Sequence, residues 1–383
     1  MSAAILVLNA GSSSLKFGLY AADTGKEILS GLAERIGSGP KVVLAGEDQE
    51  TGLPIEAGHG AVLNWVIEAL LARGADLEIV AVGHRIVHGG RDYAAPCVLG
   101  PEDMARLEAL VPLAPAHQPH NLAGVRAAQA ALPQAVQVGC FDTAFHRSQP
   151  RLAQLFAIPR ELTAEGILRY GFHGLSYEHI AAQLPEVAGK PVERAVVLHL
   201  GHGASACALL KGRSHATSMG FTALDGLVMG KRCGSIDPGV LLHLMREKGY
   251  GPGTLETLLG SQSGLLGVSG LSSDMRDLLA SEAPEAREAV DLFVYRAVAC
   301  VAEMAAALGG IDALVFTAGI GEHSAPIRQA ILEGCAWLGF TPDAARNAAK
   351  GPEITAEGCA KRAFVIPTDE EGVIARHAMR LLG

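Results

Sequence analysis

The sequence predicts an α/β protein, and three observations indicate this class. Apolar runs that read as strands alternate with segments that begin like helices. Glycine- and serine-rich breaks follow several of the strand-like runs, and no low-complexity linker interrupts the pattern. At 383 residues the chain is long enough for two or three domains.

The first expected element is a tight β-hairpin over residues 6–20, LVLNAGSSSLKFGLY, where an apolar run, a Gly/Ser-rich break and a second apolar run follow one another. Residues 195–210, AVVLHLGHGASACALL, repeat this order. The likeness favours two similar halves with a cleft between them, although a chance likeness between glycine-rich turns remains the alternative.

Further strand and helix signals alternate between and beyond these hairpins. Residues 81–90 and 136–146 each read as a strand that runs into a loop. Residues 101–114 begin with proline and acidic residues, which is typical of a helix start. Residues 313–324 read as a strand and a glycine-rich break, and the helix-like stretch 327–339 follows them.

Composition indicates a packed globular enzyme, with 49% apolar and 19% charged residues. The formal net charge of −9 argues against non-specific nucleic-acid binding and against a polybasic membrane contact. The richest apolar stretch, residues 289–310, carries Asp291, Arg296 and Glu303, so we expect a core-facing helix and no membrane span.

The chain begins without a basic leader, and its first apolar run is too short for a signal peptide. Its seven cysteines show no C-x-x-C spacing, which favours reduced, mostly buried thiols. We therefore expect a cytoplasmic protein.

The break NAGSSSLK, residues 9–16, has the components of a phosphate site without being a P-loop, because Leu15 stands where a second glycine is required. Backbone N–H groups, hydroxyls and the charge of Lys16 all suit an anion. Asn9 is a candidate for placing a metal or its waters. An ordinary hairpin turn is the alternative.

Arg85 lies inside an apolar strand pattern and therefore needs an anionic partner. The partner is either an acidic side chain in a structural salt bridge, or a carboxylate or phosphate ligand that the guanidinium binds. Asp142 ends an apolar strand, where α/β folds keep catalytic groups, although a helix cap is an equal alternative.

Glycine-rich loops carry the next candidates. His173 stands next to glycines, which allow close backbone approach, and a satisfied loop histidine is the alternative. Lys231 and Arg232 are adjacent cations with no acidic neighbour, which favours an anion site over a solvated face.

Two helix starts complete the set. Residues 270–278 read as a helix start with serine caps, where Asp274 and Arg276 serve capping or surface charge. Residues 367–375 place three acids before an apolar helix, which suits the helix dipole and also offers a Mg²⁺ ligand. Together the candidates supply what phosphoryl transfer needs, namely positioning and charge neutralisation.

Taken in order, these segments resemble the acetate kinase family. The matching stretches run over essentially the whole chain: LNAGSSSLKF, GHRIVHGG, LAPAHQPHNL, FDTAFH, YGFHGLS, HLGHGAS, MGFTALDGLVMGKRCGSIDPG, FTAGIGEH and IPTDEEGVIA. The resemblance implies the duplicated ribonuclease H-like fold of the acetate and sugar kinase, chaperone and actin superfamily. The implied domains are residues 1–146, completed by a helix over 372–383, and a nucleotide-binding domain over 147–371. It also implies a homodimer.

The reaction implied by the resemblance is direct in-line transfer from ATP to acetate, reversibly giving acetyl phosphate and ADP with Mg²⁺, or alternatively Mn²⁺. The implied catalytic residues are Asp142, His173 and Arg232. The implied substrate-binding residues are Arg85, Val87, Ala116, His117, Phe172 and Ala223, and the metal positions are Asn9 and Glu370. The implied nucleotide-binding residues are Lys16, His199, Leu200, Gly201, His202, Gly203, Asp274, Met275, Arg276, Gly319, Ile320, Gly321, Glu322 and His323.

Several positions depart from the family pattern. His202, His323 and Asp369 replace usual asparagines, so we expect an altered pH dependence or nucleotide affinity. Lys231 adds a charge where threonine is usual.

In the implied acyl pocket, Val87 and Phe172 match the family, whereas Ala116 and Ala223 replace a leucine and a proline. The alternative activity is therefore that of a propionate or butyrate kinase, unless neighbouring side chains fill the gap. We expect propionate to be used nearly as well as acetate.

A non-catalytic nucleotide-binding regulator is a further alternative. The joint retention of Arg85, Asp142, His173 and Arg232 argues against it, because a regulator needs no carboxylate clamp. A carboxylate substrate is already a nucleophile, so we expect Asp142 to orient the acid or metal-bound waters and not to act as a general base.

Overall fold

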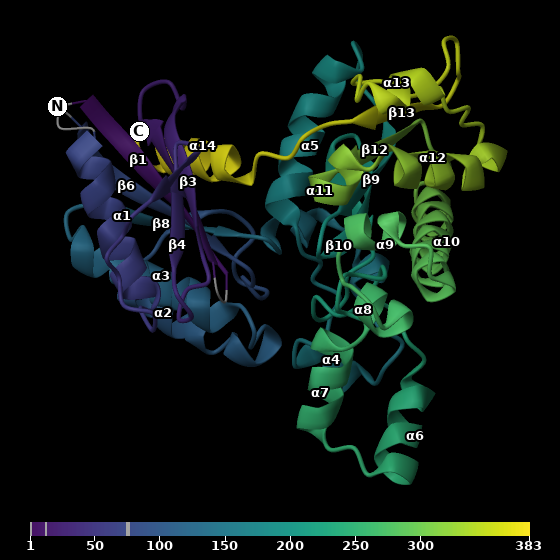
Figure 1. The fold of residues 1–383 in the computed structure, drawn as a ribbon, viewed down its shortest axis with the longest axis horizontal. Coiled ribbons are helices and arrows are strands. Elements are labelled where there is room, and N and C mark those ends of the chain that lie inside the picture. The colour runs from purple at the N-terminus through teal and green to yellow at the C-terminus, as the bar shows by residue number, and fades with distance from the viewer. Residues whose placement is uncertain (1, 12–13, 74–76) are drawn as a thin grey trace. The chain divides into compact units, whose positions relative to one another are not determined.

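The computed structural model describes residues 2–11, 14–73 and 77–383. The chain forms two compact units. The first unit comprises the chain up to Phe145 together with Asp369–Gly383, and the second comprises His146–Thr368. Each unit is built on one β-sheet with helices packed against it (Figure 1).

The described part of the first unit contains an eight-stranded sheet in the order β5-β4-β3-β2-β1-β6-β8-β7. Its strands are β1 (Ser2–Ala10), β2 (Ser14–Ala21), β3 (Glu27–Glu34), β4 (Lys41–Leu44), β5 (Glu47–Gln49), β6 (Leu77–Ile86), β7 (Cys97–Val98) and β8 (Val136–Phe141). Its helices are α1 (His59–Arg73), α2 (Pro101–Glu108), α3 (Gln118–Ala131) and α14 (Glu370–Leu382). The apolar run Ile5–Leu8 lies fully in the core, as its unbroken hydrophobicity requires.

The second unit contains a five-stranded sheet in the order β11-β10-β9-β12-β13. Its strands are β9 (Arg194–Leu200), β10 (Ala204–Leu210), β11 (Arg213–Thr217), β12 (Ala313–Thr317) and β13 (Arg362–Val365). Its helices are α4 (Arg160–Ala164), α5 (Gly174–Val187), α6 (Pro238–Lys248), α7 (Pro252–Ser261), α8 (Gly264–Ser269), α9 (Met275–Ala280), α10 (Pro284–Ala307), α11 (Ala318–His323), α12 (Ala325–Gly334) and α13 (Ala344–Ala348).

The two sheets share one pairing pattern. In β3-β2-β1-β6-β8 and in β11-β10-β9-β12-β13, two antiparallel pairings are followed by two parallel ones. The hairpins β1–β2 and β9–β10 occupy the same place in this order, so the sequence likeness between residues 6–20 and 195–210 reflects a structural repeat. The predicted α/β class is confirmed.

Most predicted elements are present, with corrections at helix ends. The core-facing helix predicted over 289–310 corresponds to α10, which buries Phe293, Ala297 and Val301 and ends at Ala307. Helix α9 is capped by the carboxylate of Asp274, so the capping role expected of Asp274 is confirmed and the expected serine caps are wrong. The helix-like stretch 327–339 ends at Gly334, and a short 3-10 turn over Ala336–Leu338 follows it.

Within the described ranges, none of the helices combines the length and the apolar character that a membrane crossing demands.

Candidate active site

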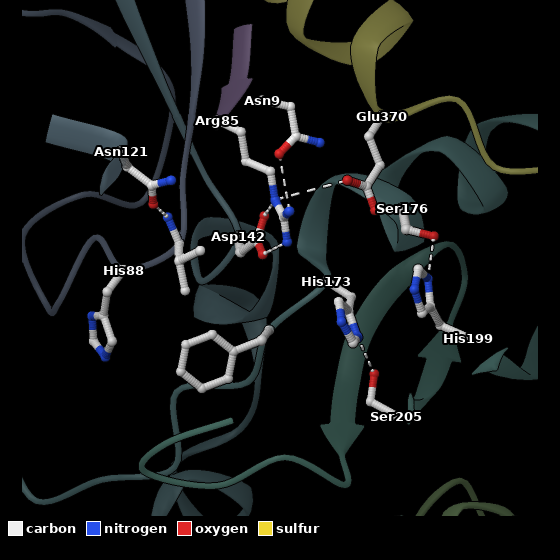
Figure 2. A network of polar contacts seen from close by, with 12 residues as sticks. Asn9, Arg85, His88, Asn121, Asp142, His173, Ser176, His199, Ser205 and Glu370 are labelled. Carbon is white, nitrogen blue, oxygen red and sulfur yellow. Dashed lines mark hydrogen bonds and ion pairs between the residues drawn. The ribbon is translucent and has the colours of Figure 1, made fainter. Parts of the chain in front are cut away.

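In the first unit, Arg85 and Asp142 meet at the carboxyl ends of the neighbouring parallel strands β6 and β8. The guanidinium donates from Nε to Oδ1 at 3.0 Å and from Nη2 to Oδ2 at 2.6 Å (Figure 2). The Asp142 side chain is 1% exposed and that of Arg85 is 21% exposed. The anionic partner that the sequence requires for Arg85 is therefore Asp142, and the ion pair is bidentate.

Two further polar groups, Asn9 and Glu370, approach this pair. Nη1 of Arg85 donates to Oδ1 of Asn9 at 3.1 Å, and Oε2 of Glu370 lies 3.8 Å from Nε of Arg85 (Figure 2). Burial raises the pKa of Glu370 well above its ordinary value, against the opposing effect of Arg85. A nearby cation stabilises the charged form of a buried carboxylate, which burial alone disfavours.

Glu371 is a site residue that the sequence interpretation missed. It accepts a hydrogen bond from Nδ2 of Asn9 at 3.2 Å and forms an ion pair with Nζ of Lys16 at 2.6 Å. Lys16, predicted to contact phosphate, is thus paired with a carboxylate, and its side chain remains 57% exposed. Ser12 and Ser13, predicted to line the same phosphate site, lie outside the described residues.

The oxygen atoms of Asn9, Glu370 and Asp142 are ligands of the type that Mg²⁺ prefers. Among the residues that the structure describes, no group of three or more His, Cys, Asp or Glu side chains forms a ready metal cage. This set fits Mg²⁺, which keeps several waters and takes one or two carboxylates together with substrate phosphates.

Helix α3 holds the loop that follows Arg85. Asn121, which is buried, accepts the backbone N–H of Val87 at 3.0 Å and donates to the carbonyl of Ala10 at 2.7 Å. Gln118 accepts from the backbone N–H of His88 at 3.1 Å and donates to its carbonyl at 3.0 Å. Neither residue was predicted to act at the site, although both lie within LAPAHQPHNL.

Two of the other predicted acyl-pocket residues of this unit, Ala116 and His117, directly precede α3. Ala116 is exposed, and His117 is the residue that immediately precedes the first turn of the helix. Val87 is buried.

In the second unit, His173 has a left-handed backbone with φ of 58° and stands at the start of α5. Its Nδ1 lies 2.8 Å from Oγ of Ser205, and its ring stacks on that of His199 with 4.0 Å between centroids (Figure 2). The preceding carbonyl, of Phe172, accepts a hydrogen bond from Nε2 of the buried His146 at 2.9 Å. The histidine is therefore fixed in position by its surroundings.

His173 and Arg232 converge on Gly203. A Cβ atom at Gly203 would lie 2.5 Å from Nη2 of Arg232 and 3.5 Å from Nε2 of His173. Nη1 of Arg232 donates to the carbonyl of Ala223 at 2.7 Å, whereas Lys231 is exposed. A side chain at this turn would clash with the guanidinium, so the glycine allows Arg232 to approach the backbone closely beside His173.

The three predicted nucleotide-binding segments border a single cavity of about 800 Å³. Of the predicted residues, the lining includes Gly201, His202, Asp274, Met275, Arg276, Gly319, Ile320 and His323. His199, Leu200, Gly203, Gly321 and Glu322 are absent from this lining. The lining that sequence reasoning missed consists of Ser273, Leu279, Ala280, Ser324 and Pro326.

Glu322 ties two backbone segments of the second unit together. Its Oε1 accepts hydrogen bonds from the backbone N–H groups of Ala318 at 2.9 Å and of Thr368 at 3.1 Å.

The three positions that depart from the family's asparagines have distinct environments. Burial, assisted by Arg232, lowers the pKa of His202. Nδ1 of His323 lies 3.1 Å from Nζ of Lys350. Asp369 caps α14 by accepting the backbone N–H of Gly372 at 2.8 Å, which an asparagine oxygen would also do.

Known proteins resemble this chain over its full length. An acetate kinase of Rhodopseudomonas palustris (strain TIE-1) is 50% identical, covering 100% of this chain and 99% of the relative. One of Methylocella silvestris is 46% identical, covering 100% and 98%.

Solved structures agree with these relatives. A propionate kinase from Francisella tularensis matches with a TM-score of 0.92 at 36% identity, covering 98% of this chain and 99% of that one. Porphyromonas gingivalis acetate kinase matches with a TM-score of 0.89 at 36% identity and full coverage of both. The model of the acetokinase family matches residues 4–376. The chain therefore belongs to the acetokinase family.

Proposed function

We propose that the protein is an acetate kinase, which transfers the γ-phosphoryl group of ATP directly to acetate and reversibly gives acetyl phosphate and ADP. The convergence of His173 and Arg232 on Gly203 carries the proposal. A guanidinium and an imidazole nitrogen that lie side by side at one glycine turn suit the equatorial oxygens of a transferring phosphoryl group.

The first unit supplies the carboxylate chemistry. Arg85 holds the carboxylate of the substrate, and Asp142 fixes the guanidinium in one orientation through two hydrogen bonds. The substrate carboxylate attacks without losing a proton, so Asp142 acts by positioning and charge, not as a general base. Val87, Ala116 and His117, with Phe172 and Ala223 of the second unit, contact the substrate.

The cofactor is Mg²⁺, for which Mn²⁺ can substitute. Asn9 and Glu370 would hold the ion, which would supply charge neutralisation at the phosphates of the nucleotide. The nucleotide contacts Lys16 and the segments His199–Gly203, Asp274–Arg276 and Gly319–His323.

The two compact units are the two ribonuclease H-like domains, with boundaries near residues 146 and 371. The enzyme works as a cytoplasmic homodimer, without nucleic-acid or membrane partners. The free cysteines support the cytoplasmic location, and the net charge of −9 argues against nucleic-acid partners.

A propionate or butyrate kinase activity is the second candidate. Two observations favour it, namely the small side chains of Ala116 and Ala223 and the 36% identity to a protein described as a propionate kinase.

Trapping of acyl phosphate with hydroxylamine tests the proposal. Purified protein with ATP and Mg²⁺ should form hydroxamate from acetate, and the Arg232→Ala variant should not. Carboxylate-independent ATP hydrolysis without hydroxamate would instead indicate a nucleotide-binding regulator. Sedimentation of the same preparation measures the oligomeric state.

A further inference from the structure

We propose that two pairs of hydroxyl side chains set the proton positions of the stacked rings of His173 and His199, holding both as neutral imidazoles with the proton on Nε2. Ser205 and Tyr177 serve His173, and Ser176 and Thr368 serve His199. The assignment itself depends only on the structure, whereas its effect on catalysis rests on the proposed function.

The first pair forms a chain that ends at His173. The hydroxyl of Tyr177 lies 2.5 Å from Oγ of Ser205, which in turn lies 2.8 Å from Nδ1 of His173. Tyr177 and Ser205 are both fully buried. Burial raises the pKa of Tyr177, so its hydroxyl keeps its proton and must donate it.

Within the described residues, Oγ of Ser205 is the acceptor available to the Tyr177 hydroxyl. The proton of Ser205 is then directed to the other neighbour of its oxygen, Nδ1 of His173. A ring nitrogen that accepts carries no proton, so the proton of the neutral ring resides on Nε2.

The second pair repeats this chain at His199. Oγ1 of Thr368 donates to Oγ of Ser176 at 2.9 Å, and Oγ of Ser176 lies 2.9 Å from Nδ1 of His199. Since Ser176 already accepts from Thr368, its own proton is directed to His199. Two independent hydroxyl pairs therefore impose the same tautomer on two stacked rings.

The stacking of the two rings disfavours a state in which both carry a charge. The centroids of His173 and His199 are 4.0 Å apart with 15° between the ring planes, so two imidazolium ions would repel strongly. Nη2 of Arg232 and Nε2 of His173 flank the same position at Gly203.

This proton placement matters for the reaction because Nε2 of His173 and Nη2 of Arg232 both lie beside Gly203. With a proton on Nε2, the ring presents a donor to a phosphoryl oxygen beside Arg232. The other tautomer would present a lone pair to the same negative oxygen. Ser205 and Tyr177 are therefore positioning residues that act through His173.

Two-bond ¹⁵N–¹H NMR of histidine-labelled protein tests the assignment directly. The His173 and His199 resonances, identified by their loss in His173→Asn and His199→Asn, should show a protonated Nε2 and a bare Nδ1 at neutral pH. A protonated Nδ1 on His173 in the wild-type protein overturns the proposal. This measurement needs no turnover, so it separates the assignment from the proposed function, whose own test is hydroxamate formation.

Kinetics of variants test the consequence for catalysis. Ser205→Ala should lower kcat for acetyl phosphate formation roughly tenfold, with a smaller change in the KM for ATP, because one orienting hydrogen bond is lost. Tyr177→Phe should also lower kcat. Ser205→Thr keeps the hydroxyl, so its kcat should be close to that of the wild-type protein.

The matched control is Tyr170→Phe, which removes another buried tyrosine hydrogen bond, to the carbonyl of Gly166 at 2.8 Å, and should leave kcat unchanged. In Ser205→Ala, the His173 ring should also show a mixture of tautomers or protonate at a higher pH. Unchanged NMR signatures in Ser205→Ala, or an equal loss of activity in Tyr170→Phe, contradict the positioning role.

Discussion

Arg85 and Asp142 form a bidentate ion pair between the ends of two neighbouring parallel strands, with N···O distances of 3.0 and 2.6 Å. The carboxylate is almost fully buried, so the guanidinium has little freedom to rotate. The third nitrogen, Nη1, donates to Asn9. The arrangement fixes a cation at the edge of the sheet where Glu370 also lies.

Asp142→Asn should lower kcat by about 100-fold or more, because the Arg85 guanidinium loses the charge that orients it. Acetyl phosphate formation at saturating ATP measures this. Asp103→Asn, which alters a carboxylate that caps α2, should retain wild-type turnover. Wild-type activity in Asp142→Asn would show that the ion pair is only structural.

Asn121→Ala should lower the free energy of unfolding by about 2–3 kcal/mol, because the buried carbonyl of Ala10 and N–H of Val87 both lose their partner. Urea denaturation followed by circular dichroism measures the loss. The exposed Asn64 offers a control, since Asn64→Ala should change stability by less than about 0.5 kcal/mol. Equal stability of the two variants would contradict the assigned role of Asn121.

The affinity for ATP should increase as the pH falls through the range in which His202 gains a proton. Its pKa is lowered in the protein, so the ring is neutral at pH 7 and becomes charged only under more acidic conditions. An anionic nucleotide that raises this pKa by about one unit binds about tenfold more tightly to the protonated form. The KM for ATP measured between pH 5 and 8 should show this slope in the wild type, and His202→Asn should remove it.

Glu370→Gln should raise the Mg²⁺ concentration required for half-maximal activity by about tenfold or more, because a carboxylate ligand is lost. Titration of activity with MgCl₂ after chelator treatment measures the requirement. Glu357→Gln, at an exposed position of the second unit, provides the matched control. An unchanged magnesium requirement in Glu370→Gln would place the metal elsewhere.

Propionate should be used nearly as well as acetate, with kcat/KM values within about tenfold, because one buried methylene changes binding only modestly. Ala116→Leu and Ala223→Pro should lower kcat/KM for propionate and butyrate more than for acetate. A steep fall from acetate to propionate in the wild type would show that other side chains fill the pocket.

The sequence by itself determined the class of fold and the segments that carry polar chemistry. Unbroken apolar runs specify buried strands such as β1 and β8, and polar residues directly after them specify the sheet edge. The resemblance named Arg85, Asp142, His173 and Arg232, and the structure places the first two together in one unit and the last two together in the other.

Only the tertiary structure decided which side chains meet. Glu370 and Glu371 are adjacent in the sequence, yet one approaches Arg85 and the other binds Lys16, because successive helical residues point about 100° apart. The stacked rings of His173 and His199, with their hydroxyl partners, come from α5, β9, β10 and the segment before α14. Such contacts depend on how distant segments pack, and no local pattern in the chain encodes them.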